Sequence, residues 1–337
     1  MRLSDFDYEL PAEFIAQTPP EKRDSSRLLI LDRSTGFIEH RRFFDIPDYL
    51  MPDDILVMND TRVSAMRLLG ERASGAKVEA LLLRNIERNV WSAMVKPGRK
   101  IQPGSRIEFG DDGLSASVLE RTESGGRILD FGDGEEIASR ITMLGQVPLP
   151  PYIQTILKDV SRYQTVYASE SGSAAAPTAG FHFTPELLKT IEERGISIAF
   201  VTLHVGIATF RPVRTEDIDD HVMHHEHISI SEEMAEKINT AKGRIISVGT
   251  TTARVLESAA IGKRRVTPID RDTNLFITPG YDFRILDGLI TNFHMPKSTL
   301  LILVSSFAGK EKIINTYNTA REEGYRFLSF GDAMFIR

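Results

Sequence analysis

Residues 231–258, SEEMAEKINTAKGRIISVGTTTARVLES, combine a helix pattern, an apolar strand and the start of a second helix. Ser231 is a typical helix cap and Gly243 a typical helix end, which predicts a helix over 231–242. The apolar run 244–248 then predicts a strand, and a Gly-Thr-Thr turn leads from it into the next helix. Alternating helices and strands are typical of a layered α/β domain whose strands form the core.

The chain on both sides of this stretch supports the same fold class. Thr184 as an N-cap predicts a helix over 185–194, and the apolar run 196–203 predicts a strand directly after it. Apolar runs at 27–31 and 54–58 predict that the N-terminal sixty residues add strands to the same sheet. The expected fold is therefore α/β, with a mixed sheet and flanking helices.

A different pattern occupies residues 62–143. Short strand-like runs alternate there with turn clusters rich in Gly, Pro and Asp, at the spacing of a small β-barrel or sandwich. We therefore expect a discontinuous α/β catalytic domain, 1–61 and 144–337, that carries a small antiparallel β-barrel inserted at 62–143. The runs that predict the inserted strands are 78–83, 91–95, 106–109, 114–119 and 127–131.

Composition limits the possible chemistry and location. The 337 residues include no Cys, which excludes disulfides, Cys-based zinc sites, iron-sulfur clusters and thiol nucleophiles. The longest apolar run, 299–308, is about half the length of a membrane span. Acidic residues stand near the N-terminus where a signal peptide would be apolar. The sequence therefore predicts a cytoplasmic protein with no membrane partner.

The charge is unevenly distributed along the chain. The net formal charge is −6, yet residues 62–110 carry ten basic and four acidic side chains, so this segment alone is +6. A basic segment in an acidic protein fits contact with nucleic-acid phosphates, although a solvated barrel surface explains it equally well. The candidate phosphate contacts are Arg84, Arg88, Lys96, Arg99 and Lys100.

Three histidines stand where predicted strands or loops end. Seven of the eight histidines follow residue 180, and His182 closes a Gly/Ala-rich loop just before a helix. His204 follows the strand 196–203, and His294 follows the apolar run that begins near 289. Because α/β proteins bind ligands at strand ends, these positions are candidates for catalysis, although a buried structural histidine is the common alternative.

The histidine-rich segment 219–227 leaves a metal site open as an alternative. Imidazole and carboxylate groups are ordinary zinc ligands. The segment has no HExxH helix pattern, however, and residues 228–230 indicate an extended strand. A carboxylate at Glu226 that holds an imidazole or a cationic ligand is an equally plausible interpretation, and we expect no metal.

Two further polar strand ends complete a predicted pocket. Gly249, Thr250 and Thr251 stand between a strand and a helix, where free backbone amides form a natural anion site. The pattern is neither a Walker loop nor a dinucleotide fingerprint, and an ordinary threonine cap would look the same. Polar residues also end the strands near 57–62 and 289–294, so we expect one pocket of mixed hydrogen-bonding groups.

Taken together, these motifs resemble the S-adenosylmethionine:tRNA ribosyltransferase-isomerase family of queuosine biosynthesis. The resemblance covers nearly the whole chain, and the order and number of its motifs carry it rather than any single one. The motifs are Tyr8-Glu9-Leu10-Pro11, Asn59-Asp60-Thr61-Arg62, Pro148-Leu149-Pro150-Pro151-Tyr152-Ile153, Tyr163-Gln164-Thr165-Val166-Tyr167, Pro177-Thr178-Ala179-Gly180-Phe181-His182, Val248-Gly249-Thr250-Thr251, Thr291-Asn292-Phe293-His294 and Gly331-Asp332-Ala333-Met334.

The resemblance implies both a fold and a reaction. The fold implied is a large α/β domain with an inserted β-barrel. The ribosyl part of S-adenosylmethionine, a co-substrate, moves to 7-aminomethyl-7-deazaguanine at the tRNA wobble position, giving epoxyqueuosine-tRNA, adenine and methionine. The scheme it implies begins with deprotonation at the 5′ carbon beside the sulfonium. The ylide then attacks the modified base, adenine leaves, an epoxide forms and methionine departs.

Roles for the candidate residues follow from this implied reaction. The general base is expected to be His182, then His204, then His294 in order of preference, and Glu226 and Asp287 are expected near the sulfonium. The methionine carboxylate is expected at Gly249, Thr250, Thr251 and Arg254. The target base or a flanking phosphate is expected at Asn59, Asp60, Thr61 and Arg62, with stacking on Tyr152, Tyr163 and Phe181.

The partner implied is tRNA, through its anticodon arm and with GUN anticodons, and no obligate protein partner is expected. Three other functions remain open at this point. They are an RNA methyltransferase, which would release S-adenosylhomocysteine, a metal-dependent hydrolase that uses the histidine-rich segment, and an RNA-binding module without catalysis. The missing glycine-rich strand-helix fingerprint weighs against the first, and the polar strand ends weigh against the last.

Overall fold

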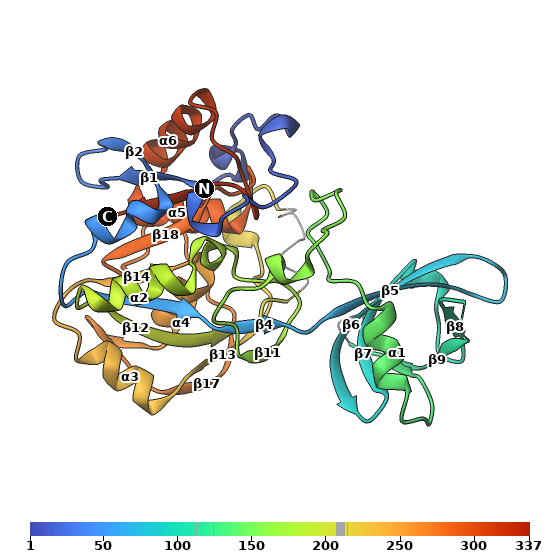
Figure 1. Cartoon of the computed structure of the whole chain (residues 1–337). Coiled ribbons are helices and arrows are strands. Elements are labelled where there is room, and N and C mark those ends of the chain that lie inside the picture. The colour runs from blue at the N-terminus through green and yellow to red at the C-terminus, as the bar shows by residue number, and fades with distance from the viewer. Residues whose placement is uncertain (112, 124, 207–212, 214) are drawn as a thin grey trace. The chain divides into compact units, whose positions relative to one another are not determined.

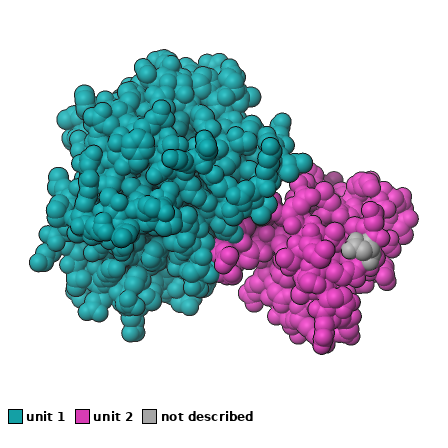
Figure 2. Space-filling model, viewed as in Figure 1, with its two compact units in different colours: residues 1–61, 151–170, 176–337 teal, residues 62–150, 171–175 magenta. Residues whose placement is uncertain are grey.

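The chain folds into two compact units in the computed structural model, which describes residues 1–111, 113–123, 125–206, 213 and 215–337 (Figures 1 and 2). Unit 1 comprises residues 1–61, 151–170 and 176–337, and unit 2 comprises residues 62–150 and 171–175. Each unit has its own apolar cluster of buried side chains, as expected of units that fold around separate cores.

Unit 1 is built on a nine-stranded mixed sheet (Figure 1). Its strand order is β17-β13-β12-β3-β14-β18-β19-β1-β2. In chain order the strands are β1 Arg27–Leu31, β2 Ile38–Arg42, β3 Ile55–Asn59, β12 Ser197–Leu203, β13 Glu226–Ile230, β14 Ile245–Val248, β17 Ile269–Thr273, β18 Gly288–Asn292 and β19 Ala333–Ile336.

Four neighbouring strands at the centre, β12, β3, β14 and β18, run parallel to one another. Their register aligns their ends, because Asn59 pairs with Val201 and Val248 pairs with both Met58 and Ile290. The segments that follow these four strands therefore emerge along one side of the sheet, called here the carboxyl edge. Every residue of β3, β14 and β18 is buried, as expected of parallel strands covered on both faces.

Helices flank this sheet. Helix α4 packs on β12, β3 and β14, and Leu187 and Ile191 of α2 join the apolar cluster on one face of the sheet. Thr184, Ser231 and Ser298 cap α2, α3 and α5, each accepting a hydrogen bond from the helical backbone. The helices of this unit are α2 Pro185–Glu193, α3 Glu232–Asn239, α4 Thr250–Ser258, α5 Thr299–Ala308 and α6 Lys310–Glu322.

Unit 2 is a closed antiparallel barrel of six strands in the order β10-β7-β6-β5-β8-β9. Helix α1 packs on it, because Ile137 and Ile141 belong to the barrel's apolar cluster. The elements are β5 Met66–Glu71, β6 Lys77–Glu87, β7 Val90–Lys96, β8 Arg106–Phe109, β9 Leu114–Arg121, β10 Arg127–Asp130 and α1 Ile137–Leu144. Shorter strands elsewhere in the chain are β4 Thr61–Val63 with β11 Glu170–Ser173 and β15 Ala260–Gly262 with β16 Arg265–Val266.

The expected fold class, an α/β sheet with an antiparallel β-barrel, is confirmed. The expected end of the barrel segment, residue 143, falls inside α1. Unit 2 runs on to Pro150 because α1 buries its apolar side chains in the barrel, and it also takes up residues 171–175. None of the helices in the described ranges combines the length and apolar character that crossing a membrane requires.

Candidate active site

Polar side chains from three segments meet at the carboxyl edge of the sheet. Asn59, at the end of β3, donates through Nδ2 to the carbonyl of Leu203 at 3.1 Å and to Thr251 Oγ1 at 3.2 Å. Its Oδ1 accepts the amides of Thr61 and Leu203. Thr61 Oγ1 lies 2.7 Å from His204 Nδ1. The amide of Asn59 therefore ties the ends of β3 and β12 to the first turn of α4.

A buried ion pair closes this arrangement on the other side of α4. Arg254, one turn after Thr250 on α4, pairs through NH1 with Glu226 of β13, and both side chains are less than 8% exposed. Glu226 Oε1 accepts the amide of Gly206 at 2.9 Å, and Arg254 Nε donates to the carbonyl of Leu275 at 3.1 Å. The second terminal nitrogen of Arg254 is buried without a hydrogen-bond partner in the described part of the chain. This nitrogen can therefore donate a hydrogen bond to a ligand that carries an acceptor group.

The first amides of α4 come before its helical hydrogen bonds begin. Thr250, Thr251 and Thr252 precede the first helical hydrogen bond, which Ala253 donates to Gly249. Gly249 has φ 91° and ψ 154°, a conformation that is essentially restricted to glycine. A side chain at Gly249 would lie 3.6 Å from the Cβ of Ala179, so the loop before His182 lies against this turn. This helix terminus has the donors and dipole of an anion site.

His204 has one ring nitrogen without a partner among the described residues. The imidazole is half-buried, and its ring stacks on that of His227 with centroids 5.7 Å apart. Burial lowers the pKa of His204 below its usual value, and the neighbouring His227 lowers it further, while Glu170 opposes both. The ring is therefore neutral at physiological pH, with Nδ1 held by Thr61.

His182 is a buried structural member of the same edge. It is 3% exposed, stacks on Phe43 and uses both ring nitrogens, with Ser26 Oγ 2.7 Å from Nδ1 and Asn292 Nδ2 3.2 Å from Nε2. Burial lowers its pKa to about 3, and the charges of Arg326 and Arg23 act in the same direction. Because the amide of Asn292 must donate to Nε2, the imidazole has no free lone pair for a substrate proton.

His294, like His182, is buried and has a polar group beside each ring nitrogen. It is 8% exposed, and its ring nitrogens lie 3.2 Å from Tyr317 Oη and 3.3 Å from Thr291 Oγ1. Burial lowers its pKa to about 3. The first and third of the expected candidates, His182 and His294, are therefore enclosed by protein, whereas the second, His204, is only half-buried.

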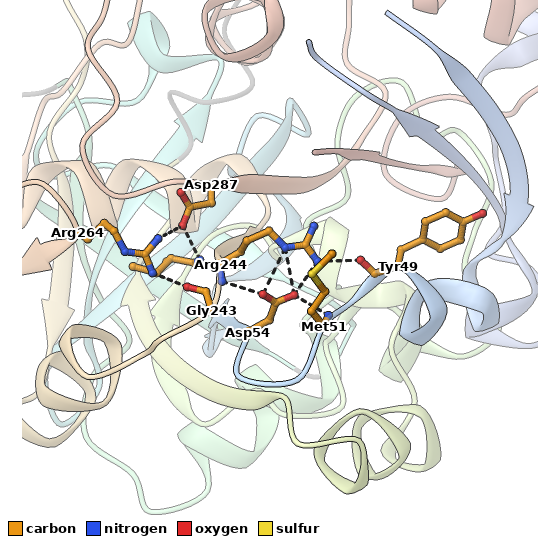
Figure 3. Close-up of polar contacts among 8 residues, drawn as sticks. Tyr49, Met51, Asp54, Gly243, Arg244, Arg264 and Asp287 are labelled. Carbon is orange, nitrogen blue, oxygen red and sulfur yellow. Dashed lines mark hydrogen bonds and ion pairs between the residues drawn. The ribbon is translucent and has the colours of Figure 1, made fainter. Parts of the chain in front are cut away.

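Asp287 lies at the opposite edge of the sheet, directly before β18 (Figure 3). Its carboxylate pairs with Arg264 and accepts the amide of Ile245 at 2.9 Å. Beside it, Arg244 binds the buried Asp54. The five residues of β18 place Asp287 roughly 16 Å from the carboxyl edge. The structure does not bring Asp287 to the other candidates, because it joins strand starts rather than strand ends.

The three expected stacking aromatics occupy different environments. Tyr163 and Phe181 are 1% and 7% exposed and pack edge to face, with ring centroids 5.6 Å apart. Tyr152 is half-buried, and its hydroxyl lies 2.8 Å from Ser329 Oγ. Tyr163 and Phe181 therefore serve as core in the described structure, and Tyr152 is the more accessible ring.

The expected RNA-contact residues lie in both units. Asp60 is half-buried in unit 1, accepts the hydroxyl of Thr202 at 2.8 Å, and has its pKa raised by burial. Arg62 is exposed in unit 2. The five basic candidates of the barrel are all exposed as well: Arg84, Arg88, Lys96, Arg99 and Lys100.

The histidine-rich segment does not form a metal-ligand cluster within the described ranges. His224 and His225 are exposed, and His221 packs against the ring of Phe276. His227 instead faces Asp270, with His227 Nε2 3.1 Å from its carboxylate. Glu226 is the one residue of the segment that points inward, and its partner is Arg254.

Three polar residues, Asn292, Thr178 and Tyr167, stand in the sequence motifs but were given no role from the sequence. Asn292 joins the imidazole of His182 to the hydroxyl of Thr178, which donates to Asn292 Oδ1 at 3.1 Å. Tyr167 has a buried hydroxyl with no partner among the described residues, and a side chain at Gly180 would collide with that hydroxyl. Asn292 stands in a polar strand end, and that signal could have identified it. Nothing in the sequence separates Tyr167 from the neighbouring aromatics.

Comparisons with known proteins agree on one family. A model of the queuosine biosynthesis protein family matches residues 3–336. The S-adenosylmethionine:tRNA ribosyltransferase-isomerases of Acetivibrio thermocellus and Desulforamulus reducens are 54% and 51% identical to this chain, each over the full length of both sequences. A crystal structure of S-adenosylmethionine tRNA ribosyltransferase from Thermotoga maritima matches with a TM-score of 0.56 and 38% identity, covering 99% of this chain and 100% of that one.

Proposed function

Because the chain belongs to the queuosine biosynthesis protein family, we propose that the carboxyl edge of the unit 1 sheet is its active site. The protein transfers and isomerises the ribosyl moiety of S-adenosylmethionine onto 7-aminomethyl-7-deazaguanine at the tRNA wobble position. The products are epoxyqueuosine-tRNA, adenine and methionine. S-adenosylmethionine is a co-substrate of this reaction.

His204 is the proposed general base, and one observation carries this assignment. Its Nδ1 is held by Thr61, whose hydroxyl also lies 3.5 Å from the carbonyl of Glu170. When Thr61 donates to that carbonyl, its oxygen accepts Nδ1–H, which leaves a lone pair on Nε2. The lowered pKa of His204 keeps Nε2 unprotonated at neutral pH. Nε2 is therefore suited to take a proton from the 5′ carbon beside the sulfonium.

In the later steps the ribosyl fragment becomes bonded to the aminomethyl nitrogen of the modified base, which gives up a proton. Adenine leaves with the electron pair of its glycosidic bond and takes up a proton, and methionine leaves with the electron pair of its carbon–sulfur bond as the epoxide closes. The proton on His204 Nε2 is then available to a leaving group or to solvent. The role of the protein in these steps is to hold the two substrates together and to place charges where they develop.

The start of α4 is the proposed site of the methionine carboxylate. The amides of Thr250 and Thr251 and the unpartnered nitrogen of Arg254 supply donors for it. Glu226 is a positioning residue in this proposal, because its carboxylate fixes Arg254 rather than facing a sulfonium. Asn59 positions the hydroxyl of Thr251 in the same way.

The second substrate is RNA. The substrate is proposed to be the anticodon arm of tRNAs with GUN anticodons. The base is proposed to contact Asp60 and Tyr152, and the phosphates are proposed to contact Arg62 and the exposed basic residues of the barrel. We further propose that the protein acts in the cytoplasm, without a metal and without an obligate protein partner.

The experiment that tests the proposal uses S-adenosylmethionine and an anticodon stem-loop that carries 7-aminomethyl-7-deazaguanine. Mass spectrometry is expected to detect adenine, methionine and RNA that has gained a ribosyl-derived mass. His204→Gln is expected to reduce the rate about 10² to 10⁴-fold, the usual contribution of a general base. S-adenosylmethionine deuterated at the 5′ carbon is expected to slow the wild-type reaction if proton removal limits the rate.

Two controls separate catalysis from folding. His40→Gln replaces another histidine of unit 1, whose Nδ1 lies 2.7 Å from Tyr325 Oη on the β2 side of the sheet, and it is expected to retain activity. Circular dichroism checks that both variants fold. Release of S-adenosylhomocysteine would identify a methyltransferase instead, and full activity in His204→Gln would remove His204 from the mechanism.

A further inference from the structure

Two arginines of unit 1 line a small hollow outside the proposed active site. Arg23 and Arg162 stand there together with Phe181, His182 and Ser329, and the enclosed part of the hollow measures only about 10 Å³, so a ligand would bind at its open mouth. Both arginines are half-buried, so their guanidinium groups are partly removed from water and partly reachable.

Backbone carbonyls are the partners of both guanidinium groups. Arg23 donates to the carbonyls of Phe181 and Ser161 at 3.3 and 3.2 Å. Arg162 donates to the carbonyls of Glu21 and Pro20 at 3.1 and 2.6 Å, and its Nε is buried without a partner in the described structure. A carbonyl satisfies a donor but does not neutralise its charge, so two positive charges remain side by side.

One acidic side chain, Asp159, is close enough to influence both arginines, and its carboxylate already accepts hydrogen bonds. Asp159 Oδ1 accepts the amide and the hydroxyl of Ser161 at 3.0 and 2.6 Å, and it forms no ion pair with either arginine in the described part of the chain. Burial lowers the pKa of Arg23, and the charge of Arg162 lowers it further, while the carboxylate of Asp159 opposes both. Like charges held together in a partly dry hollow favour an anionic ligand.

We propose that Arg23 and Arg162 bind a backbone phosphate of the RNA substrate. Planar guanidinium groups match the geometry of phosphate oxygens, and Arg162 Nε has a hydrogen still to donate. The hollow is lined by Phe181 and His182, and His182 in turn contacts Asn292 at the carboxyl edge. A phosphate bound there lies beside the loop that packs against the start of α4. This inference rests on the proposed function, because it takes the RNA to be the substrate.

The test measures the affinity of the full-length protein for the modified anticodon stem-loop as a function of salt. Arg23→Gln and Arg162→Gln each remove one charge. Because both arginines share one phosphate, the double variant is expected to reduce the slope of log K against log salt by about 0.7 to 0.9, the value of one phosphate contact, and each single variant is expected to reduce it by part of that. Arg162→Lys keeps the charge but loses the guanidinium fork, so it is expected to keep most of the slope. Arg194→Gln is the matched control, because Arg194 is an exposed arginine paired with Asp48 at the opposite edge of the sheet.

The outcomes separate a phosphate contact from a structural crosslink. A reduced slope in both glutamine variants, with Arg194→Gln unchanged, supports the proposal. An unchanged slope overturns it, and so does an equal reduction in Arg194→Gln, because that result reflects net charge alone. If the glutamine variants do not fold, the wild-type protein still gives an answer through chemical modification of its arginines.

Phenylglyoxal modification followed by mass spectrometry uses the unaltered protein. The stem-loop is expected to protect Arg23 and Arg162 and to leave Arg194 reactive. Protection by inorganic phosphate alone, without protection by RNA, would assign the hollow to a free anion and overturn the RNA assignment. The proposed function fails separately, because it requires adenine and methionine as products whatever the salt slope and the protection pattern are.

Discussion

The three candidate histidines differ in how far the surrounding protein has already used their ring nitrogens. His182 and His294 each contact two hydrogen-bonding groups, and burial lowers the pKa of both to about 3. His204 contacts one such group through Nδ1 and is half-buried. The enclosed imidazoles of His182 and His294 can orient their neighbours. The half-buried imidazole of His204 can exchange a proton with a ligand.

The acid side of the pH profile tests His204 directly. A base acts only when it is unprotonated, so kcat/KM is expected to be lost as the pH falls through the lowered pKa of His204, below 6.5. His227→Gln removes a neighbouring group that lowers this pKa, so the acid limb is expected to move to higher pH. Steady-state kinetics between pH 4.5 and 8 provide the measurement. A limb that stays in place would show that another group titrates.

The buried ion pair between Glu226 and Arg254 leads to a prediction about protein stability. Both side chains are buried, so Glu226→Ala leaves the charge of Arg254 uncompensated and is expected to destabilise the protein by about 3 to 5 kcal/mol. Replacing both residues, Glu226→Leu with Arg254→Met, removes both charges and is expected to recover most of this loss. Chemical denaturation followed by circular dichroism measures the stability.

The double variant also separates stability from binding. Since Arg254 is proposed to hold the methionine carboxylate, the double variant is expected to be folded but to bind S-adenosylmethionine weakly in calorimetry. Wild-type affinity in that variant would reduce the pair to a structural role. A double variant as unstable as Glu226→Ala would contradict the assignment of the lost stability to an uncompensated charge.

The turn before α4 is expected to contribute to ligand binding through its backbone amides. Gly249→Ala forces φ near 91° on a residue with a side chain, at a cost of about 1 to 3 kcal/mol. A shift of the amides that follow is expected to weaken S-adenosylmethionine binding about 5- to 30-fold, equivalent to 1 to 2 kcal/mol of anion binding. Calorimetric titration measures this affinity.

Gly309 provides a matched control for Gly249. It precedes α6 with φ 94° and ψ 131°, and a side chain there would meet no atom within 4 Å. Gly309→Ala is therefore expected to lose similar stability while S-adenosylmethionine affinity stays at the wild-type value. An equal loss of affinity in both variants would mean that general destabilisation, rather than the amides of α4, weakens binding.

Elements could be predicted from the sequence where local chemistry determines them. Thr184 and Ser231 were identifiable as caps because a hydroxyl before a helix satisfies its free amides. The polar ends of β3 and β18 pointed to the carboxyl edge for the same local reason. The sequence places Asp287 just before the apolar run of β18, but only the parallel pairing of β18 with β14 shows that this start lies at the edge opposite to the other candidates.

The positive charge of unit 2 is local, because the 13 basic and 12 acidic side chains of the unit give it a net charge of only +1. The basic stretch 62–110 belongs to unit 2, and its five candidate contacts form two groups on the β6–β7 hairpin. Arg84 and Arg88 lie toward the turn, and Lys96, Arg99 and Lys100 lie at and beyond the end of β7, roughly 15 to 20 Å away along the strands. Composition predicted the basic segment, but only the pairing of β6 with β7 shows that it is divided.

Substituting each of these two basic groups separately tests which of them contacts RNA. Replacing Arg84 and Arg88 by Gln, or Lys96, Arg99 and Lys100 by Gln, is expected to raise KM for tRNA and to reduce the salt slope of RNA binding by about 0.7 to 0.9 per lost phosphate contact. All five side chains are exposed, so folding, kcat and affinity for S-adenosylmethionine are expected to stay unchanged. Arg121→Gln, an exposed arginine on β9 of the same barrel, controls for net charge. If only one group matters, the RNA contacts one end of the hairpin, and if neither does, the positive charge of the barrel serves no RNA contact and unit 1 alone must bind the tRNA.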